Sequence, residues 1–307
     1  MNLKVKDIGE KELVKYMIDN CNTITPDDCA ITSLNSNLNL ISTTDMLIQS
    51  HHFPNFMNYF EMGFKAVTVN VSDIAAMGGE PIGFLLSIAL PQDLLFKDFK
   101  EIFQGVLKAC EYYNIPLIGG DTNEASEIII SGTALGLTDN AIMKNTYNCD
   151  DLIAITGDLG KQALDFYKGI YNSPKAKIHE GQILKNNGIT AMTDITDGLA
   201  SELFEMYNLK NGFTIYEDKL ASDKEFRQEV FKLDLDPLDL ILYFGEDFEL
   251  LFTFPKSKYN DLKERLDFKV IGEVSKDNTI EIVLSNGDRK LLKNKGFNHF
   301  KGDENEI

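Results

Sequence analysis

The sequence contains few of the residues that build zinc sites or disulfide frameworks. Its 307 residues include four cysteines and four histidines, and no pair of cysteines has the C-x-x-C spacing. Thiols without a pattern are typical of a reducing compartment, and the charged N-terminal stretch lacks the apolar run of a signal peptide. Long apolar segments are also missing, because none approaches the ~20 residues that cross a bilayer. We therefore expect a cytoplasmic protein with no membrane partner.

Positive charge is scarce as well. The chain has 30 Lys and Arg residues against 48 Asp and Glu residues, which gives a formal net charge of −18 at pH 7. The basic residues are scattered along the chain, so nucleic acid is not expected as a partner. An acidic surface often serves only solubility, yet acidic side chains at strand ends can also hold divalent cations. The total charge leaves both interpretations open.

The common nucleotide-binding and nucleophile motifs are absent from the sequence. It has no G-x-x-x-x-G-K-[ST], no G-x-G-x-x-G after a strand and no protein-kinase motif set. It has no G-x-S-x-G elbow, and Cys29 lies within DDCA, where the neighbouring carboxylates raise the pKa of its thiol and suppress the thiolate. A phosphoryl-transfer enzyme with this sequence therefore needs another fold.

Apolar periodicity predicts alternating helices and strands. We expect helices over 11–17, 57–78, 95–113 and 237–243, and strands over 38–48, 82–90, 115–118, 127–137, 151–156, 248–254, 270–274 and 280–283. A connector over 144–150 separates the two sets. The pattern predicts an α/β (α+β) chain of two domains, over residues 1–140 and 141–307.

Acidic residues recur beside Gly, Thr or Ser in several of these segments. They are Asp28, Asp45, Asp73, Asp121 and the pair Asp194 and Asp197. If these carboxylates converge, they repel one another by several kcal/mol unless cations lie between them. Mg²⁺ takes one or two protein carboxylates together with water and phosphate oxygens, so this set suggests several ions on a polyphosphate. Each aspartate has an alternative interpretation as a turn, cap or solvated residue.

The stretch from Met192 to Leu203, MTDITDGLASEL, is the most informative of these segments. A strand is expected to end at Asp194, and Asp197 or Thr196 is expected to cap the helix that follows. The free N–H groups of a helix N-terminus attract phosphate, and carboxylates attract Mg²⁺. An Asp cap followed by a Gly turn explains the same residues. The stretch alone therefore does not decide between a helix cap and a site for metal and phosphate.

Seven short segments together carry a family resemblance. They are DDCA at 27–30, TTDMLIQSHHF at 43–53, NVSDIAAMGGEP at 70–81, LIGGDT at 117–122, DITDGL at 194–199, GEDFELLFT at 245–253 and GFNHF at 296–300. In this order they span nearly the whole chain and resemble the thiamine-monophosphate kinase family, part of the group similar to aminoimidazole ribonucleotide synthetase. The resemblance implies a homodimer with a half-barrel N-terminal sheet and a C-terminal α/β sandwich. It also implies ATP as co-substrate, several Mg²⁺ ions and direct transfer of the γ-phosphoryl group to thiamine monophosphate.

The resemblance also implies roles for single residues. The Mg²⁺ shell would contain Asp28, Thr43, Thr44, Asp45, Asp73, Asp121, Asp194 and Asp197, with Asp27 as a less certain member. Nucleotide contacts would be Thr43, Gly120, Asp121, Lys144 and Thr196, and substrate contacts His52, Glu246 and Phe297, the last stacking on the thiamine rings. Charge neutralisation by Asp45, Asp121, Asp194 and Asp197 would replace a covalent nucleophile, since in-line phosphoryl transfer needs positioning and charge.

The sequence departs from the family pattern at three places. The family has Arg followed by S-G-A-K-P-G-D where this chain has Lys144 followed by NTYNCDD. Lysine offers a phosphate a point charge in place of the bidentate contact of arginine. Alternatively, Lys144 is a solvated lysine of the connector. Phe297 keeps stacking but lacks the polar group of the family's Trp or Tyr. The Pro- and Arg-rich loop is reduced to SPKAK at 173–177.

Other functions were weighed against these residues. A selenophosphate synthetase needs a Cys in a Gly-rich N-terminal loop with a nearby Lys, and a hydrogenase-maturation relative is expected to end in a Cys-bearing tail rather than DENEI. The purine enzyme of the group stays an alternative. A non-catalytic cation-binding or nucleotide-binding protein explains the aspartates, but it does not explain Glu246 and the GFNHF segment.

Overall fold

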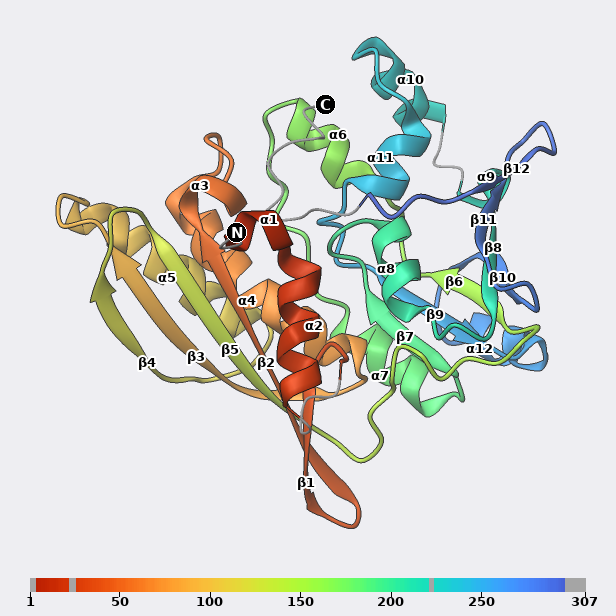
Figure 1. The fold of residues 1–307 in the computed structure, drawn as a ribbon. Helices are drawn as coiled ribbons and strands as arrows, with labels where there is room; N and C mark the ends of the chain where they lie inside the picture. The colour runs from red at the N-terminus through yellow and green to blue at the C-terminus, as the bar shows by residue number, and fades with distance from the viewer. Residues whose placement is uncertain (1–3, 22–25, 221–223, 296–307) are drawn as a thin grey trace.

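The computed structural model describes residues 4–21, 26–220 and 224–295. The chain builds one β-sheet from each half, and the two sheets lie at the left and right of Figure 1. Helices pack against both sheets. Phe297 lies outside the described residues, so its predicted stacking role stays a prediction.

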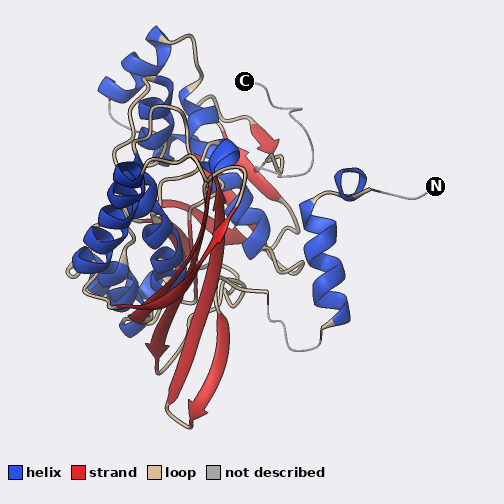
Figure 2. Ribbon diagram, turned by 90° about the vertical axis from the view of Figure 1, so that its left-hand side faces the viewer, coloured by secondary structure: helices blue, strands red, loops and turns tan. Residues whose placement is uncertain are grey.

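The first sheet has the strand order β1-β2-β5-β3-β4. Its strands are β1 (Ala30–Asn35), β2 (Leu38–Ile48), β3 (Glu80–Leu90), β4 (Leu117–Glu124) and β5 (Ile129–Thr138). The pair β3 and β4 runs parallel, and the other neighbours run antiparallel. β5 alternates half-buried and buried residues, as in a sheet with one face on the core. Helix α4 covers that face and packs against α5, and Figure 2 shows most helices on one side of the strands, with the N-terminal helix on the other.

The N-terminal half contains α1 (Val5–Ile8), α2 (Glu10–Asn20), α3 (Gln49–His52), α4 (Tyr59–Ala76) and α5 (Phe96–Tyr112). Helix α4 begins with a capping box, in which Asn58 accepts from Glu61 N and Glu61 accepts from Asn58 N. It ends before Gly78, whose positive φ of 66° suits a helix C-terminus. Most of its residues are buried, because it packs against β2, β5 and α5 on one side and against α7 and β7 of the second half on the other. Helix α4 therefore belongs to the interior of both halves.

Two glycines allow α4 and α5 to touch through their backbones. A Cβ on Gly105 would lie 2.0 Å from the carbonyl oxygen of Phe60, and one on Gly63 would lie 1.9 Å from that of Ile102. Neither position has room for a larger residue. The close contact holds α4 in place above the sheet.

The second sheet has the strand order β12-β11-β8-β10-β6-β9-β7. Its strands are β6 (Leu152–Ile155), β7 (Ala191–Asp194), β8 (Gly212–Tyr216), β9 (Leu250–Phe254), β10 (Lys269–Ser275), β11 (Ile280–Val283) and β12 (Arg289–Leu291). The helices are α6 (Lys161–Tyr167), α7 (Ile178–Asn186), α8 (Leu199–Met206), α9 (Glu217–Leu220), α10 (Lys224–Lys232), α11 (Pro237–Tyr243) and α12 (Tyr259–Lys263), with a 3₁₀ turn at Lys256–Lys258. β7, which ends at Asp194, is the edge strand beside α4. The edge of the second sheet thus faces the helix that covers the first.

The predicted elements with strong periodicity are confirmed. The predicted strands at 38–48 and 280–283 and the predicted helix at 237–243 match β2, β11 and α11. The predicted strand at 115–118 was too short, because β4 continues through the Gly-Gly-Asp-Thr segment to Glu124. Strands β1, β8 and β12 were not predicted. Among the described residues no helix has the length and apolar character that crossing a bilayer requires.

Gly105→Ala should destabilise the protein by about 1–3 kcal/mol, because the added methyl group overpacks the contact between α4 and α5. Urea unfolding measures the change as a lower midpoint at constant slope. Gln104→Ala, at an exposed neighbouring position, is the matched control and should leave the midpoint within experimental error. Equal midpoints for Gly105→Ala and the wild type would show that the helices separate freely.

Candidate active site

Strand β2 and helix α4 supply the first part of a polar cluster in the protein interior. Side chains alternate between the two faces of a strand, so Thr43 and Asp45 both face α4. The Thr43 hydroxyl donates to Asp73 Oδ2 at 2.5 Å, and the Asp45 backbone N–H donates to Asn70 Oδ1 at 3.1 Å. Asn70 is fully buried. This turn of α4 thereby ties Asn70 and Asp73 to the middle of β2.

Strand β7 and the segment before β1 supply the second part. The Thr193 hydroxyl donates to Asp28 Oδ1 at 3.1 Å, and Asp194 ends the strand with 3% of its surface exposed. Lys144 Nζ lies 3.8 Å from Asp28 Oδ1, and the Lys144 backbone N–H donates to Asp27 Oδ2 at 3.2 Å. The predicted connector lysine is mostly buried and faces the acidic cluster.

Burial raises the pKa of each central carboxyl. It raises the pKa of Asp28 to about 8 and those of Asp45 and Asp194 to about 6. The pKa of Asp73 rises well above its usual value, first through burial and then through repulsion from Asp45, Asp194 and Asp28. Mutual repulsion of this kind requires that the groups lie close together. We name Asp28, Asp45, Asp73 and Asp194 the acidic cluster.

The acidic cluster has oxygens that the protein leaves without partners. Asp28 Oδ2 and Asp194 Oδ2 are buried and accept no hydrogen bond from the described residues. Buried carboxylate oxygens without donors are costly, and hard cations such as Mg²⁺ prefer them as ligands. Within the described residues no three His, Cys, Asp or Glu side chains already surround one point as an ion site. The donor set therefore fits ions that take one or two carboxylates each and complete their shell with water and phosphate oxygens.

The turn after Asp194 differs from the predicted helix cap. The N-cap of α8 is Gly198, with φ of 98° and no side-chain cap, so the expectation that Asp197 or Thr196 caps this helix was wrong. The buried Glu202 carboxylate instead accepts from the backbone N–H groups of Thr196 and Asp197 at 3.4 and 3.0 Å. Burial raises the pKa of Glu202 well above its usual value. The turn is thus held from within α8, which leaves Asp197 on the exposed side.

Two of the predicted substrate residues meet at one lysine that the sequence analysis did not single out. Lys65 Nζ donates to the His52 carbonyl at 3.0 Å and lies 2.7 Å from Glu246 Oε2. The signal for Lys65 was present as the single positive charge of α4. Gly245, with φ of 84°, precedes Glu246, and a Cβ there would lie 2.2 Å from the Thr196 carbonyl oxygen. Only glycine allows this close approach of the two loops.

Other predicted residues lie away from the acidic cluster in this chain. Thr44 faces the opposite side of β2, where its hydroxyl donates to Gly132 O at 2.8 Å. Asp121 is exposed on β4 and pairs in register with Ser87, three strand positions from β2. At the ~4.8 Å spacing of strands this separation is about 14 Å. Gly120 is the exposed neighbour of Asp121. The roles assigned to these residues stay predictions.

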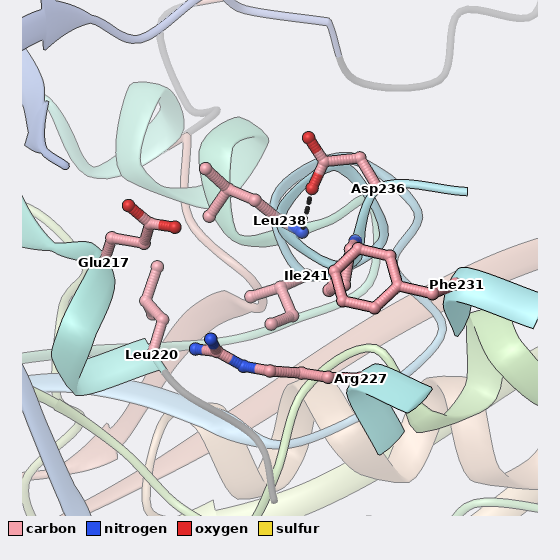
Figure 3. Close-up of a pocket in the computed structure, with 8 residues that line it drawn as sticks. Glu217, Leu220, Arg227, Phe231, Asp236, Leu238 and Ile241 are labelled. Atoms are coloured by element: carbon pink, nitrogen blue, oxygen red, sulfur yellow. Dashed lines mark hydrogen bonds between the residues drawn. The ribbon is translucent and has the colours of Figure 1, made fainter. Parts of the chain in front are cut away.

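A small pocket in the second half is separate from this site. It lies between α9, α10 and α11 and is lined by Glu217, Leu220, Arg227, Phe231, Asp236, Pro237, Leu238 and Ile241 (Figure 3). Asp236 accepts from the Leu238 backbone N–H and caps α11. The pocket contains none of the predicted site residues, and the chemistry of the acidic cluster gives it no role.

The raised pKa values determine how stability depends on pH without Mg²⁺. The folded protein keeps protons on Asp28, Asp45 and Asp194 that the unfolded chain releases near pH 4, so stability should fall as pH rises from about 5 to about 8. Asp194→Asn removes one ionising group and should be more stable than the wild type at pH 8. Thermal unfolding in EDTA measures both effects, with Asp93→Asn on the surface as control. A wild-type stability that rises over this range would contradict the repulsion.

Comparison with known proteins agrees with this geometry. The family described as AIR synthase related protein, N-terminal domain, matches residues 26–138, and AIR synthase related protein, C-terminal domain, matches residues 161–285. The thiamine-monophosphate kinase of Pyrococcus horikoshii is 35% identical over 96% of this chain and 97% of the relative. That of Methanocaldococcus jannaschii is 36% identical over 86% of this chain and 89% of the relative.

The similarity to a solved structure also extends over nearly the whole chain. The structure of AaThiL complexed with AMPPCP and TMP is 28% identical, has a TM-score of 0.86 and covers 97% of this chain and 99% of that chain. The fold therefore extends over both halves, including the elements that carry the acidic cluster. Since the sequence identity also extends over nearly the whole length of these relatives, the chain belongs to the thiamine-monophosphate kinase family of AIR synthase related proteins.

Proposed function

We propose that this protein is a thiamine-phosphate kinase, which transfers the γ-phosphoryl group of ATP to thiamine monophosphate and gives thiamine diphosphate and ADP. The observation that carries the proposal is the acidic cluster, to which both halves of the chain contribute buried carboxyls. Relatives named thiamine-monophosphate kinase align over nearly the whole chain, and the structure of AaThiL was solved with AMPPCP and TMP.

The acidic cluster can hold the cations that neutralise phosphate charge during phosphoryl transfer. The acceptor is itself a phosphate anion, so the reaction needs charge neutralisation and alignment rather than a covalent nucleophile. Asp28, Asp45, Asp73 and Asp194 would hold Mg²⁺, which supplies positive charge at the transferring phosphoryl group. Lys144 adds a cation at the edge of the same site. Burial is the largest single effect and lowers the pKa of Lys144, but the carboxylates of Asp28, Glu205, Asp27 and Glu202 together outweigh it, and the net pKa lies above the usual value.

The remaining contacts follow from the same proposal. ATP would contact Thr43, Gly120, Asp121, Lys144 and Thr196, with Thr44, Asp121 and Asp197 as further metal ligands. His52, Glu246 and Phe297 would contact thiamine monophosphate. Support comes from Thr43 and Lys144, which lie at the acidic cluster, and from His52 and Glu246, which share Lys65 as a partner.

We also propose a cytoplasmic location for the protein. Cys21, Cys29, Cys110 and Cys149 are all free thiols in the described residues. Free thiols in this number suit a reducing compartment.

ADP should form only when ATP, Mg²⁺ and thiamine monophosphate are all present. Asp194→Asn should lower kcat by roughly 100-fold or more, because a charged group that organises the transferring phosphoryl group is lost. A coupled assay for ADP measures both effects. Asp93→Asn, an exposed aspartate outside the acidic cluster, should keep wild-type activity.

Two results would contradict the assignment. Equal ATP consumption with selenide or with formylglycinamidine ribonucleotide would move the protein to another activity of the same group. Near-normal turnover of Asp194→Asn would reduce Asp194 to a structural role. Since Asp194→Asn should also be stable at pH 8, loss of activity through unfolding can be checked directly by its melting temperature.

We further propose a homodimer formed through the open face of the first sheet, which is the face directed away from α4. Met46 on β2 and Ile118 on β4 lie on this face and are 58% and 51% exposed. An exposed apolar sheet face is typical of an interaction surface, and pairing two open sheets would cover it. In-register pairing of Met46 with Ser131, Ser131 with Ser87 and Ser87 with Asp121 puts Asp121 on the same face. Asp121 can then reach an active site only across the interface.

Mixing two inactive variants tests this arrangement. If Asp121 serves the site of the partner subunit, mixed dimers of Asp121→Asn and Asp194→Asn contain one intact site. Random reassociation of equal amounts should then restore about one quarter of wild-type activity. Mixing Asp45→Asn with Asp194→Asn is the control, since both residues belong to one chain's cluster, and should restore none. A monomeric protein in sedimentation analysis, or no recovery in the first mixture, would contradict the shared site.

A further inference from the structure

Lys65 is a buried lysine whose charge requires specific partners in the protein interior. It lies in α4 with 3% of its surface exposed, and it is the only Lys or Arg among the described residues that is this deeply buried. Transferring an ammonium group from water into a protein interior is costly unless the charge is paired and hydrogen-bonded. The residues next to Lys65 in α4 are buried apolar or small residues, and the Glu61 carboxylate one turn earlier accepts from the Asn58 backbone N–H. The observed partners of Lys65 come from outside the helix.

Those partners belong to two distant segments of the chain. Lys65 Nζ donates to the backbone carbonyl of His52, at the end of α3, at 3.0 Å. It also lies 2.7 Å from Glu246 Oε2, in the loop before β9 of the second half. One ammonium group thus joins a residue of each half of the molecule to the helix that lies between them.

Among the described residues, Lys65 is the ion-pair partner of the Glu246 carboxylate. The Glu246 side chain is 36% exposed, whereas Lys65 is 3% exposed, so the pair lies at the boundary between interior and solvent. Lys65 engages Oε2, which leaves Oε1 as the oxygen that a ligand can approach. The backbone of Glu246 has a positive φ of 61°, and its N–H donates to the Thr196 carbonyl at 2.8 Å. A non-glycine residue adopts this conformation at a cost, which suits a side chain that must point in one direction.

Tyr171 senses the charge of the same pair. Burial and then the Glu246 carboxylate raise the pKa of Tyr171 well above its usual value. Tyr171 packs against the core of the first half. The direct partner of the Glu246 carboxylate is therefore the Lys65 ammonium group.

Helix α4 also fixes the distance between this pair and the acidic cluster. Lys65 and Asp73 are eight residues apart in one helix, and at 1.5 Å per residue the separation along the axis is about 12 Å. Toward its N-terminus α4 carries Lys65, which holds the Glu246 carboxylate. Toward its C-terminus it carries Asp73 of the acidic cluster, which suits Mg²⁺ and phosphate. An elongated ligand with a phosphate at one end and a cationic ring system at the other matches this arrangement.

We propose that Lys65 is a positioning residue for the acceptor substrate. It fixes Oε2 of Glu246 and the backbone at His52, so that Oε1 of Glu246 meets the ring end of the acceptor at a set distance from the phosphoryl-transfer site. This role rests on the proposed thiamine-phosphate kinase activity. Lys65 does not touch the transferring phosphoryl group, and its effect is therefore confined to binding of the acceptor.

Lys65→Met tests the role, because methionine fills the space of the lysine stem without its charge. The KM for thiamine monophosphate should rise about tenfold or more, while kcat and the KM for ATP should change by less than about threefold. Calorimetric titration with thiamine monophosphate should show the same loss of affinity, and titration with a non-hydrolysable ATP analogue should show none. Lys65→Arg keeps the charge and should recover part of the affinity for the acceptor.

A double-mutant cycle with Glu246→Gln separates positioning from general stability. If Lys65 acts through Glu246, the double variant should lose no more affinity for the acceptor than the worse single variant. Lys108→Met is the matched control, since Lys108 forms an exposed ion pair with Glu111 at 2.8 Å on α5, and its KM values should equal those of the wild type. Should Lys65→Met fail to fold, Lys65→Arg and Glu246→Gln still complete the comparison, because both keep a polar group at the pair.

Three outcomes would overturn the proposal. The first is an unchanged KM for thiamine monophosphate in Lys65→Met. The second is an equal rise in the KM for ATP, and the third is additive losses in the cycle. A wild-type protein that neither binds nor phosphorylates thiamine monophosphate would overturn the proposed function itself, and this result is distinct from an active wild type with an unaffected Lys65 variant.

Discussion

The burial of like charges around one helix is the constraint on which this structure depends. Asp28, Asp45, Asp73 and Asp194 come from four segments, and their carboxyls lie in an interior where ionisation is unfavourable. Hydrogen bonds from the hydroxyls of Thr43 and Thr193 satisfy part of the cluster. The burial of apolar side chains in three clusters offsets the rest of the unfavourable energy and holds these segments together. Such a cluster is suited to a cationic ligand, because binding relieves the repulsion.

Helix α4 gives this cluster its geometry. It packs on the first sheet, touches α5 through glycine contacts and meets β7 and α7 of the second half. A helix enclosed on so many sides has little freedom to slide or rotate. Its two ends therefore form a rigid spacer, with Lys65 and Glu246 near one end and Asp73 near the other. Phe248 strengthens the same junction, since it belongs to the second half but is buried in the core of the first.

Local sequence motifs do not determine where each side chain lies in the fold. Local letters at Thr196 and Asp197 are typical of a helix cap, yet Glu202, from the next turn of chain, occupies the backbone donors that a cap would use. Thr44 stands between Thr43 and Asp45 in one motif, but the alternation of strand faces directs it to the opposite side of β2, and Asp121 lies on the open face of β4. A motif fixes which residues are neighbours in sequence. It does not fix which face of the sheet each one occupies.

The strongly periodic elements of secondary structure and the kind of chemistry could be predicted from the sequence alone, because periodicity, turn residues and the recurrence of aspartate are local properties. The apolar periodicity within residues 38–48 predicts the strand that they form, and the periodicity within residues 59–76 predicts a helix. The meeting of Asp28, Asp45 and Asp194, and the pairing of Lys65 with Glu246, required the folded chain. Both depend on contacts between segments more than 100 residues apart, and the order of strands and the packing of α4 decide these contacts rather than any local preference.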